Sequence, residues 1–466
     1  MAISTINRFI SVLDAAFQAL PAQVSMLETE RLAILVHHAM ESQTRAYHTS
    51  GHVFGMCEGM KPLQVLAALF HDLVYYQLDE GFPKHSAYLL EGVTRKEGEA
   101  LTLQPIPPDD LPLSICAALF DFAPGQALPL YGGMNEFLSA VVAARLLQPH
   151  LCVADLIAVL ACIEATIPFR TPDVQGRSAI TRLAQKVQQQ YCLRVDGRDI
   201  GRAQEFADRV ATDAVTLTNR DVGSFGEADP GLFLSNTWLL IEESNAPLAV
   251  AGMYTLQEYR FGLTRMDAFL RTLNPNHVFQ CYMDTPTPAE LANLCAAARR
   301  NIAFSVDFLG AKIASIAMVE ALALCTGTDG PISMFLGEIR SAYGLPERVE
   351  DYLPAVPAKG DVNPDLLRVF EKGRTLESAN DLTASPITAF VYRYIGHDGT
   401  QQALAQARQM FDGSLTPLAF LQSLDREMAC AIIRACAHIA LSRREALGAL
   451  QQLLQRPDTD ADRTLR

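Results

Sequence analysis

The chain has 466 residues, of which 49% are hydrophobic and 19% are charged, and its formal net charge is −14. This length allows two or three domains with ample cores, and the composition is that of a compact globular protein. The negative charge argues against general affinity for nucleic acid polymers or anionic membranes, whereas a local cation can still hold a small phosphorylated ligand.

The ten cysteines are scattered, form no Cys-x-x-Cys pair, and lie mostly in apolar runs, so we interpret them as reduced core thiols. The first residues lack the basic start and apolar stretch of a secretion signal. We also expect charge, proline or glycine to interrupt every long apolar run before about 18 residues. Together these features predict a cytoplasmic protein.

Helical spacing of apolar residues dominates the chain, which predicts an all-α fold. In the first half we expect helices at residues 5–20, 27–44, 50–60, 62–78, 84–96, 110–123, 134–147, 152–167, 176–191 and 200–220. A polar stretch at residues 242–247 suggests a boundary, giving domains at 1–245 and 246–466.

The second domain is expected to be helical and to serve assembly or substrate gating. Thr287-Pro-Ala-Glu290 is typical of a capping box with proline in the first turn, and it should begin a helix that runs to about Cys325. Further helices are expected near residues 401–412, 416–436 and 442–454.

An adjacent histidine and aspartate, His71 and Asp72, lie in the apolar run from Pro62 to Tyr76, which predicts a buried helix. An unpaired carboxylate in such a place costs several kcal/mol, so Asp72 needs a partner. A divalent cation fits best, because neighbouring helical residues project about 100° apart. One ion beside the helix could therefore take both side chains at adjacent coordination positions.

Two segments, Tyr47-His48-Thr-Ser-Gly-His52 and Phe70-His71-Asp72-Leu-Val-Tyr75, resemble the HD-domain superfamily of metal-dependent phosphohydrolases. The resemblance covers roughly residues 30–240 and implies a helical HD core around one metal ion. It also implies that His52, His71 and Asp72 are metal ligands and that a later aspartate is the fourth. Asp221 is the preferred fourth ligand, and the alternatives at this stage are Asp155 and Asp213.

Two imidazoles and two carboxylates would partly neutralise a divalent ion and leave positions open for water and a phosphate oxygen. Such a site suits phosphoester hydrolysis by a metal-activated water, with Asp72 both a ligand and part of the catalytic group. The ion could be Mn, Mg, Co, Ni, Fe or Zn. The shortage of further histidines, apart from His85 and His150, favours a single ion.

Four other residues are candidates for the site. His48 lies just outside the expected helix start, in an acid/base or a structural role, and Arg45 either binds substrate phosphate or lies on the surface. Glu164 is an acidic residue in an apolar helix, either a catalytic group that orients a ligand or the salt-bridge partner of Arg170. Arg170 is otherwise a second candidate for binding substrate.

We interpret Asn135-Glu136 as a helix start and His397-Asp398 as a turn with a capping aspartate. The leading hypothesis is a hydrolase of a small phosphorylated molecule, such as a nucleotide, with no nucleic acid or membrane partner. Its oligomeric state stays open. The alternatives are a non-catalytic nucleotide sensor that acts through a partner and an HD-type di-iron oxygenase.

Overall fold

The computed structural model of the protein describes residues 3–338, 346–376, 378 and 380–456. It is 64% helical, and the described residues form 18 α-helices and one two-stranded sheet. The all-α class predicted from the sequence is therefore confirmed.

The chain forms two compact units, and neither of them is continuous in sequence. Unit 1 comprises Met1–Glu227 and Leu273–Arg299, and unit 2 comprises Ala228–Thr272 and Arg300–Arg466. The boundary expected after residue 245 thus falls inside the first segment of unit 2. Residues 273–299, expected in the second domain, belong to unit 1.

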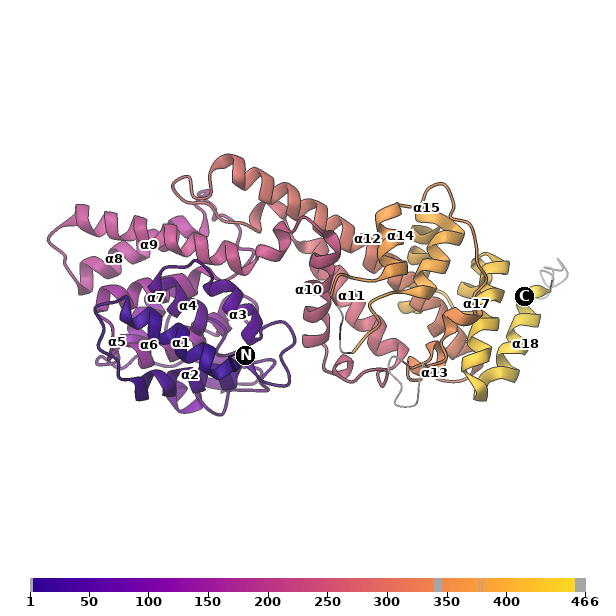
Figure 1. Ribbon diagram of the computed structural model, residues 1–466, viewed down its shortest axis with the longest axis horizontal. Coiled ribbons are helices and arrows are strands. Elements are labelled where there is room, and N and C mark those ends of the chain that lie inside the picture. The colour runs from indigo at the N-terminus through magenta and orange to yellow at the C-terminus, as the bar shows by residue number, and fades with distance from the viewer. Residues whose placement is uncertain (1–2, 339–345, 377, 379, 457–466) are drawn as a thin grey trace. The chain divides into compact units, whose positions relative to one another are not determined.

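Unit 1 is built around two helices that are buried on nearly every side. Helix α7 packs against α4, α5, α6, α8 and α9, and all of its residues from Leu156 to Ala165 are buried. Helix α4 is buried from Gln64 to Phe70, and Figure 1 shows the other helices of the unit around these two. The helices of this unit before residue 228 are α1 (Thr5–Gln18), α2 (Met26–Met40), α3 (Ser50–Cys57), α4 (Pro62–Phe70), α5 (Leu111–Phe120), α6 (Met134–Leu147), α7 (Val153–Ala165), α8 (Ala179–Arg194) and α9 (Ile200–Asp221).

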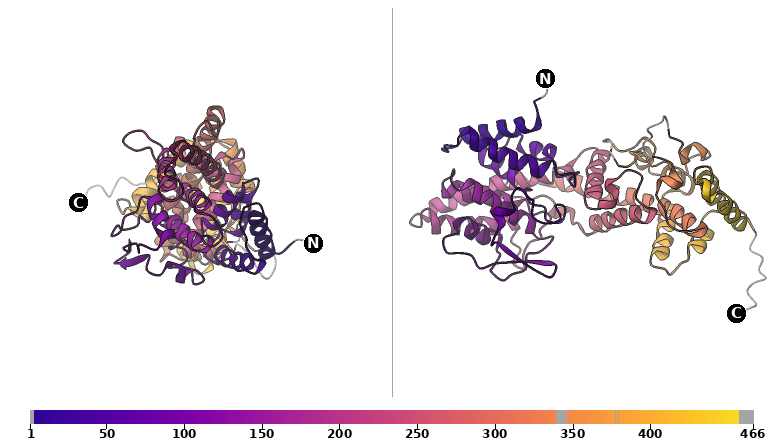
Figure 2. Two further views of the ribbon diagram at one scale, coloured as in Figure 1. Left: turned by 90° about the vertical axis from the view of Figure 1, so that its left-hand side faces the viewer. Right: turned by 90° about the horizontal axis from the view of Figure 1, so that it is seen from below.

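The prediction of a helix at residues 84–96 is wrong. The structure has a 3-10 turn at Ala87–Leu90 followed by β1 (Thr94–Glu97), which pairs antiparallel with β2 (Ala100–Leu103). The hairpin is visible as two arrows in the right-hand view of Figure 2. Gly92 and Gly98 have φ values of +73° and +62°, which end the turn and allow the hairpin.

Helix α4 ends at Phe70, eight residues before the predicted end at residue 78 (78 minus 70). His71 therefore caps the helix, and Asp72 lies in the turn that follows. Side chains from elsewhere bind the backbone of this turn: Val74 N donates to Ser139 Oγ at 3.0 Å and Tyr76 N donates to Asn135 Oδ1 at 3.1 Å. These tertiary bonds take the place of further helical ones.

Unit 2 is also helical, and one of its helices begins in unit 1. Helix α12 runs from Pro288 to Thr326, and its start has the predicted capping box, with Thr287 N donating to Glu290 Oε2 at 2.9 Å. Both the start and the end predicted for this helix are confirmed. The other helices are α10 (Pro230–Glu243), α11 (Leu256–Thr272), α13 (Ser333–Leu336), α14 (Pro364–Lys372), α15 (Pro386–Phe411), α16 (Pro417–Ser423), α17 (Arg426–Ile439) and α18 (Arg444–Gln455).

Helix α12 is the one described helix that is long and apolar enough to cross a membrane. Asp307, Gly310, Lys312 and Glu320 interrupt the apolar run of this helix, as the sequence predicted. Moreover, 89% of its most apolar window is buried within the protein, as in the core helix of a soluble protein. This burial is consistent with a soluble protein.

The pair His397-Asp398 lies within α15, where Gly396 has a φ of +75° and interrupts the helix. The Asp398 N–H donates to Asp361 Oδ2 at 3.1 Å. The capping carboxylate is thus Asp361, from a distant part of the sequence, and not Asp398 as predicted.

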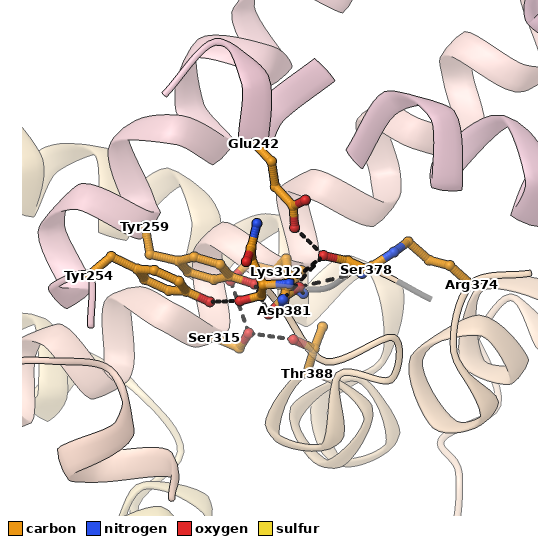
Figure 3. A network of polar contacts seen from close by, with 10 residues as sticks. Glu242, Tyr254, Tyr259, Lys312, Ser315, Arg374, Ser378, Asp381 and Thr388 are labelled. Carbon is orange, nitrogen blue, oxygen red and sulfur yellow. Dashed lines mark hydrogen bonds and ion pairs between the residues drawn. The ribbon is translucent and has the colours of Figure 1, made fainter. Parts of the chain in front are cut away.

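The core of unit 2 contains a buried network of charged and polar side chains (Figure 3). Lys312 Nζ lies 3.3 Å from Asp381 Oδ2 and 4.3 Å from the centre of the Trp238 ring. Arg374 Nη1 lies 3.5 Å from the same oxygen, and the Tyr259 hydroxyl donates to Asp381. Burial lowers the pKa of Lys312 to about 8, although Asp381 opposes the shift. One carboxylate thus links α11, α12 and the segment before α15.

Candidate metal centre

Three side chains from adjoining parts of unit 1 bring a nitrogen or oxygen atom to one point. His52 is on α3, and His71 and Asp72 follow the end of α4. Their ligand atoms all lie within 4.8 Å of one another. His71 Nε2 is 2.8 Å from Asp72 Oδ2, and His52 Nε2 is 3.9 Å from the same oxygen.

These three atoms are buried, yet none has a hydrogen bond of acceptable geometry among the described residues. The atoms concerned are His52 Nε2, His71 Nε2 and Asp72 Oδ2. Leaving buried polar atoms unsatisfied costs about 1–3 kcal/mol each, and more for charged groups. A divalent cation between them would satisfy all three at once, so the residues fit the ion that the sequence predicts.

The other ring nitrogen of His71 has a defined partner. His71 Nδ1 lies 2.8 Å from the Ala68 carbonyl oxygen, one turn earlier on α4. A carbonyl only accepts hydrogen bonds, so Nδ1 carries a proton, and loss of the second proton would leave the lone pair of the ring on Nε2, which faces the group. The structure therefore fixes the tautomer that binds a metal.

A second carboxylate, that of Asp221, completes the group. Asp221 is the last residue of α9, and its Oδ1 lies 3.1 Å from His52 Nε2 and 3.8 Å from His71 Nε2. Of the two alternatives, Asp213 binds Lys61 Nζ at 2.6 Å, and Asp155 lies in the first turn of α7, outside the described group. The structure thus brings together the four preferred ligands.

The histidines and aspartates of the group strongly shift one another's pKa values. Burial lowers the pKa of His71, but Asp72 and Asp221 outweigh this and raise it well above its ordinary value. Burial raises the pKa of Asp221, but His52 and His71 lower it to about 2. Both carboxylates are therefore ionised at neutral pH and ready to bind a cation. The side chains of Asp72 and Asp221 are 14% and 17% exposed, so both carboxylates keep some contact with solvent.

His48 lies beside this group, as predicted, just before the Thr49 N-cap of α3. Its ring meets those of His52 and Tyr75 edge to face, at centre distances of 5.9 Å and 5.0 Å. It is also close enough to lower the pKa of Asp72. These contacts place the His48 ring next to His52, one of the residues of the group.

Arg45 has a different environment from the one expected of a substrate ligand. Its side chain is 0% exposed, and its guanidinium donates to the Asp72 carbonyl at 2.6 Å and to Asp79 Oδ2 at 2.9 Å. Both hydrogen bonds lie within the protein. Neither predicted role of Arg45, a contact with substrate phosphate or a position on the surface, agrees with this environment. Instead, Arg45 supports the turn that carries Asp72.

Glu164 and Arg170 pair with each other instead of joining the site. Arg170 Nη1 donates to Glu164 Oε1 at 2.7 Å and Arg170 Nη2 to Glu164 Oε2 at 3.2 Å. This bidentate pair neutralises the carboxylate inside the core. The structure therefore supports the salt-bridge alternative, and neither residue belongs to the described group of ligand atoms.

Glu136, which the sequence pattern assigned only to a helix start, lies close enough to the group for the charges of Asp72 and Asp221 to act on it. It lies in the first turn of α6, where burial, together with the charges of Asp72 and Asp221, raises its pKa to about 7. The sequence pattern of a helix start does not predict that Glu136 lies near the candidate metal centre. The packing of α6 against α4 brings the start of α6 near the residues that follow α4.

Comparisons of the chain with protein-family models, with curated proteins and with solved structures found no match.

Proposed function

We propose that this protein is a cytoplasmic, metal-dependent phosphohydrolase of the HD superfamily, with one divalent ion held by His52, His71, Asp72 and Asp221. The observation that carries the proposal is the convergence of three buried donor atoms that have no hydrogen-bond partner among the described residues. A set of two imidazoles and two carboxylates favours a transition metal such as Mn, Fe, Co, Ni or Zn over Mg.

When bound, the ion would supply a Lewis acid for a phosphoryl oxygen and would lower the pKa of a water ligand. The protein supplies the remaining groups. Asp72 and Asp221 balance the charge of the ion, and His48 can donate a hydrogen bond to the phosphoryl group. Glu136, with a pKa of about 7, is suited to accept or return a proton near neutral pH.

The substrate is proposed to be a small phosphorylated molecule, because the acidic protein disfavours anionic polymers. A di-iron oxygenase would need a second set of ligands, and the described residues contain one such group. We therefore favour a single ion and hydrolysis.

The test combines metal binding with turnover. Chelated protein is melted with Mn²⁺, Co²⁺, Ni²⁺ or Mg²⁺, and turnover is measured on a panel of phosphoesters that includes nucleotides. Metal at 100 times its Kd should stabilise the protein by about 2.7 kcal/mol. His71→Ala should abolish this stabilisation and all turnover.

The matched control is His85→Ala, because the exposed His85 ring stacks on His38 outside the group. This variant should behave like the wild type. Absence of metal binding in the wild type would refute the proposal. Stabilisation by a nucleotide without turnover would indicate a sensor, and two irons per chain would indicate an oxygenase.

A further inference from the structure

The last turn of α9, which carries Asp221, is bound by the segment of unit 1 that comes later in the sequence, residues 273–299. Asn219 Nδ2 donates to the Gln280 carbonyl at 2.8 Å, and Gln280 N donates to Asn219 Oδ1 at 2.8 Å. One side-chain amide thus pairs with both backbone groups of one residue, as a neighbouring strand would.

The same segment contacts the chain on the other side of Asp221. A Cβ atom added to Gly226 would lie 3.0 Å from Leu294 Cδ2 and 3.4 Å from Phe279 Cζ, so the two parts of the chain approach closely. Phe279 is 4% exposed. Residues 273–299 therefore hold the backbone both before and after Asp221.

This support matters because of the position of Asp221 in its helix. The last residues of a helix lack partners for their carbonyl groups, and helix ends fray. A metal ligand must be held within about 0.2 Å of its bonding distance. The final turn of α9 therefore needs a restraint from outside the helix if Asp221 is to bind an ion.

We propose that Asn219 is a positioning residue for the metal centre: through Gln280 it fixes the turn that presents Asp221. This inference rests on the proposed metal site but not on any particular substrate. It also means that the metal-binding unit needs residues 273–299. A chain that ended at residue 245 would lack this support.

A second link between the same two parts of the chain provides a matched control. The Tyr282 hydroxyl donates to Asp208 Oδ1 at 2.6 Å. Asp208 precedes Asp221 by 13 residues on α9 (221 minus 208), which is about 20 Å along a helix. Removing this bond should loosen the segment without disturbing the final turn of α9.

The experiment titrates Co²⁺ into full-length wild-type, Asn219→Ala and Tyr282→Phe proteins and follows the visible absorption of the bound ion. Asn219→Ala should weaken Co²⁺ binding about 10- to 100-fold, as expected for a partner that orients a ligand, and should alter the absorption bands. Tyr282→Phe should lower the melting temperature but leave the affinity and the spectrum unchanged.

Equal affinities for Asn219→Ala and the wild type would overturn the inference, and so would equal losses in both variants. If Asn219→Ala does not fold, Asn219→Gln replaces it, because this variant keeps the amide on a side chain one methylene longer. It should weaken binding in the same direction but by less. Wild-type protein that binds no Co²⁺ would overturn the metal site as well, which distinguishes the two failures.

Discussion

At the scale of single residues, the charges of the candidate metal centre decide when it can bind an ion. His71 has a raised pKa because Asp72 and Asp221 outweigh the effect of burial. Without a metal, the proton on His71 therefore balances part of the negative charge of the two carboxylates, as the cation would. Metal and proton compete for the same lone pair, since only the deprotonated Nε2 can be a ligand.

This competition predicts that metal affinity rises with pH. Below the raised pKa of His71, each unit of pH should change the apparent Kd about tenfold, because one proton leaves when the ion binds. The folding stability of the metal-free protein should show the opposite trend and fall as pH rises. A raised pKa in the folded state stabilises it fully below the unfolded pKa of about 6.5, and this contribution is lost as pH rises through the folded value.

Calorimetric titration of Co²⁺ from about pH 6 to pH 8, in buffers of different ionisation enthalpy, checks this prediction and counts the released protons. An affinity independent of pH, with no proton release, would contradict it.

Glu136 should act in catalysis and not in metal binding. We predict that Glu136→Gln lowers kcat about 100- to 10,000-fold, because the amide cannot transfer a proton. The Kd for the metal should change little. The rate should also lose the ionisation that the wild type shows near its pKa of about 7.

Turnover and Co²⁺ affinity measured on the same preparation separate these two effects. A loss of metal affinity that accounts for the whole loss of rate would show that Glu136 acts through the ion's position instead.

At the scale of secondary structure elements, the turn after α4 is held by partners outside the helix. Arg45 and Asp79 support it together: Arg45 binds the Asp72 carbonyl and Asp79, while the Tyr75 N–H donates to Asp79 Oδ2 at 3.1 Å. The side chains of Arg45 and Asp79 are 0% and 8% exposed, so they are paired away from water.

Replacing Asp79 should therefore damage both the fold and the metal site. We expect Asp79→Asn to destabilise the protein by about 3–5 kcal/mol, because it leaves the buried Arg45 charge without its partner. Metal affinity should fall with it, since the turn carries Asp72. Urea unfolding and a Co²⁺ titration measure the two effects.

The control for this variant is Glu97→Gln, which removes one half of the exposed Arg95–Glu97 pair in the hairpin. Exposed pairs contribute about 0–1 kcal/mol, so this change should be nearly neutral. Similar losses in the two variants would argue against a special role for the buried pair.

At the scale of the whole molecule, the two units have polar interiors of different kinds. In unit 1, buried donor atoms of the candidate metal centre lack hydrogen-bond partners among the described residues. In unit 2, Asp381 accepts contacts from Lys312, Arg374 and Tyr259 (Figure 3). We interpret the first arrangement as a site for an ion and the second as a structural network.

The structural interpretation predicts a separation of stability from metal binding. Asp381→Asn should destabilise the protein by about 3–5 kcal/mol, because the buried charges of Lys312 and Arg374 lose their shared carboxylate. The affinity for Co²⁺ should stay at the wild-type value. Glu445→Gln, at an exposed position on α18, should change stability by no more than about 0.5 kcal/mol.

Denaturant unfolding and Co²⁺ titration of the folded variants test this prediction. A tenfold or larger change in Co²⁺ affinity for Asp381→Asn would show that the network influences the metal centre.

The sequence by itself determined the features that depend on neighbouring residues. Helical periodicity predicted the all-α class and most helices of unit 1, and the capping box at Thr287 predicted where α12 begins. The motif residues named the side chains that meet at the candidate metal centre. These predictions succeeded because burial patterns and helix caps are set by residues only a few positions apart.

Only the tertiary structure decided the features that depend on partners far apart in sequence. It ended α4 at Phe70, where Ser139 and Asn135 bind the next backbone groups. It also brought Glu136 to the site and returned residues 273–299 to unit 1. The physical reason is the same in each case: a buried polar group must find a partner, and that partner can come from any part of the chain that packing brings near.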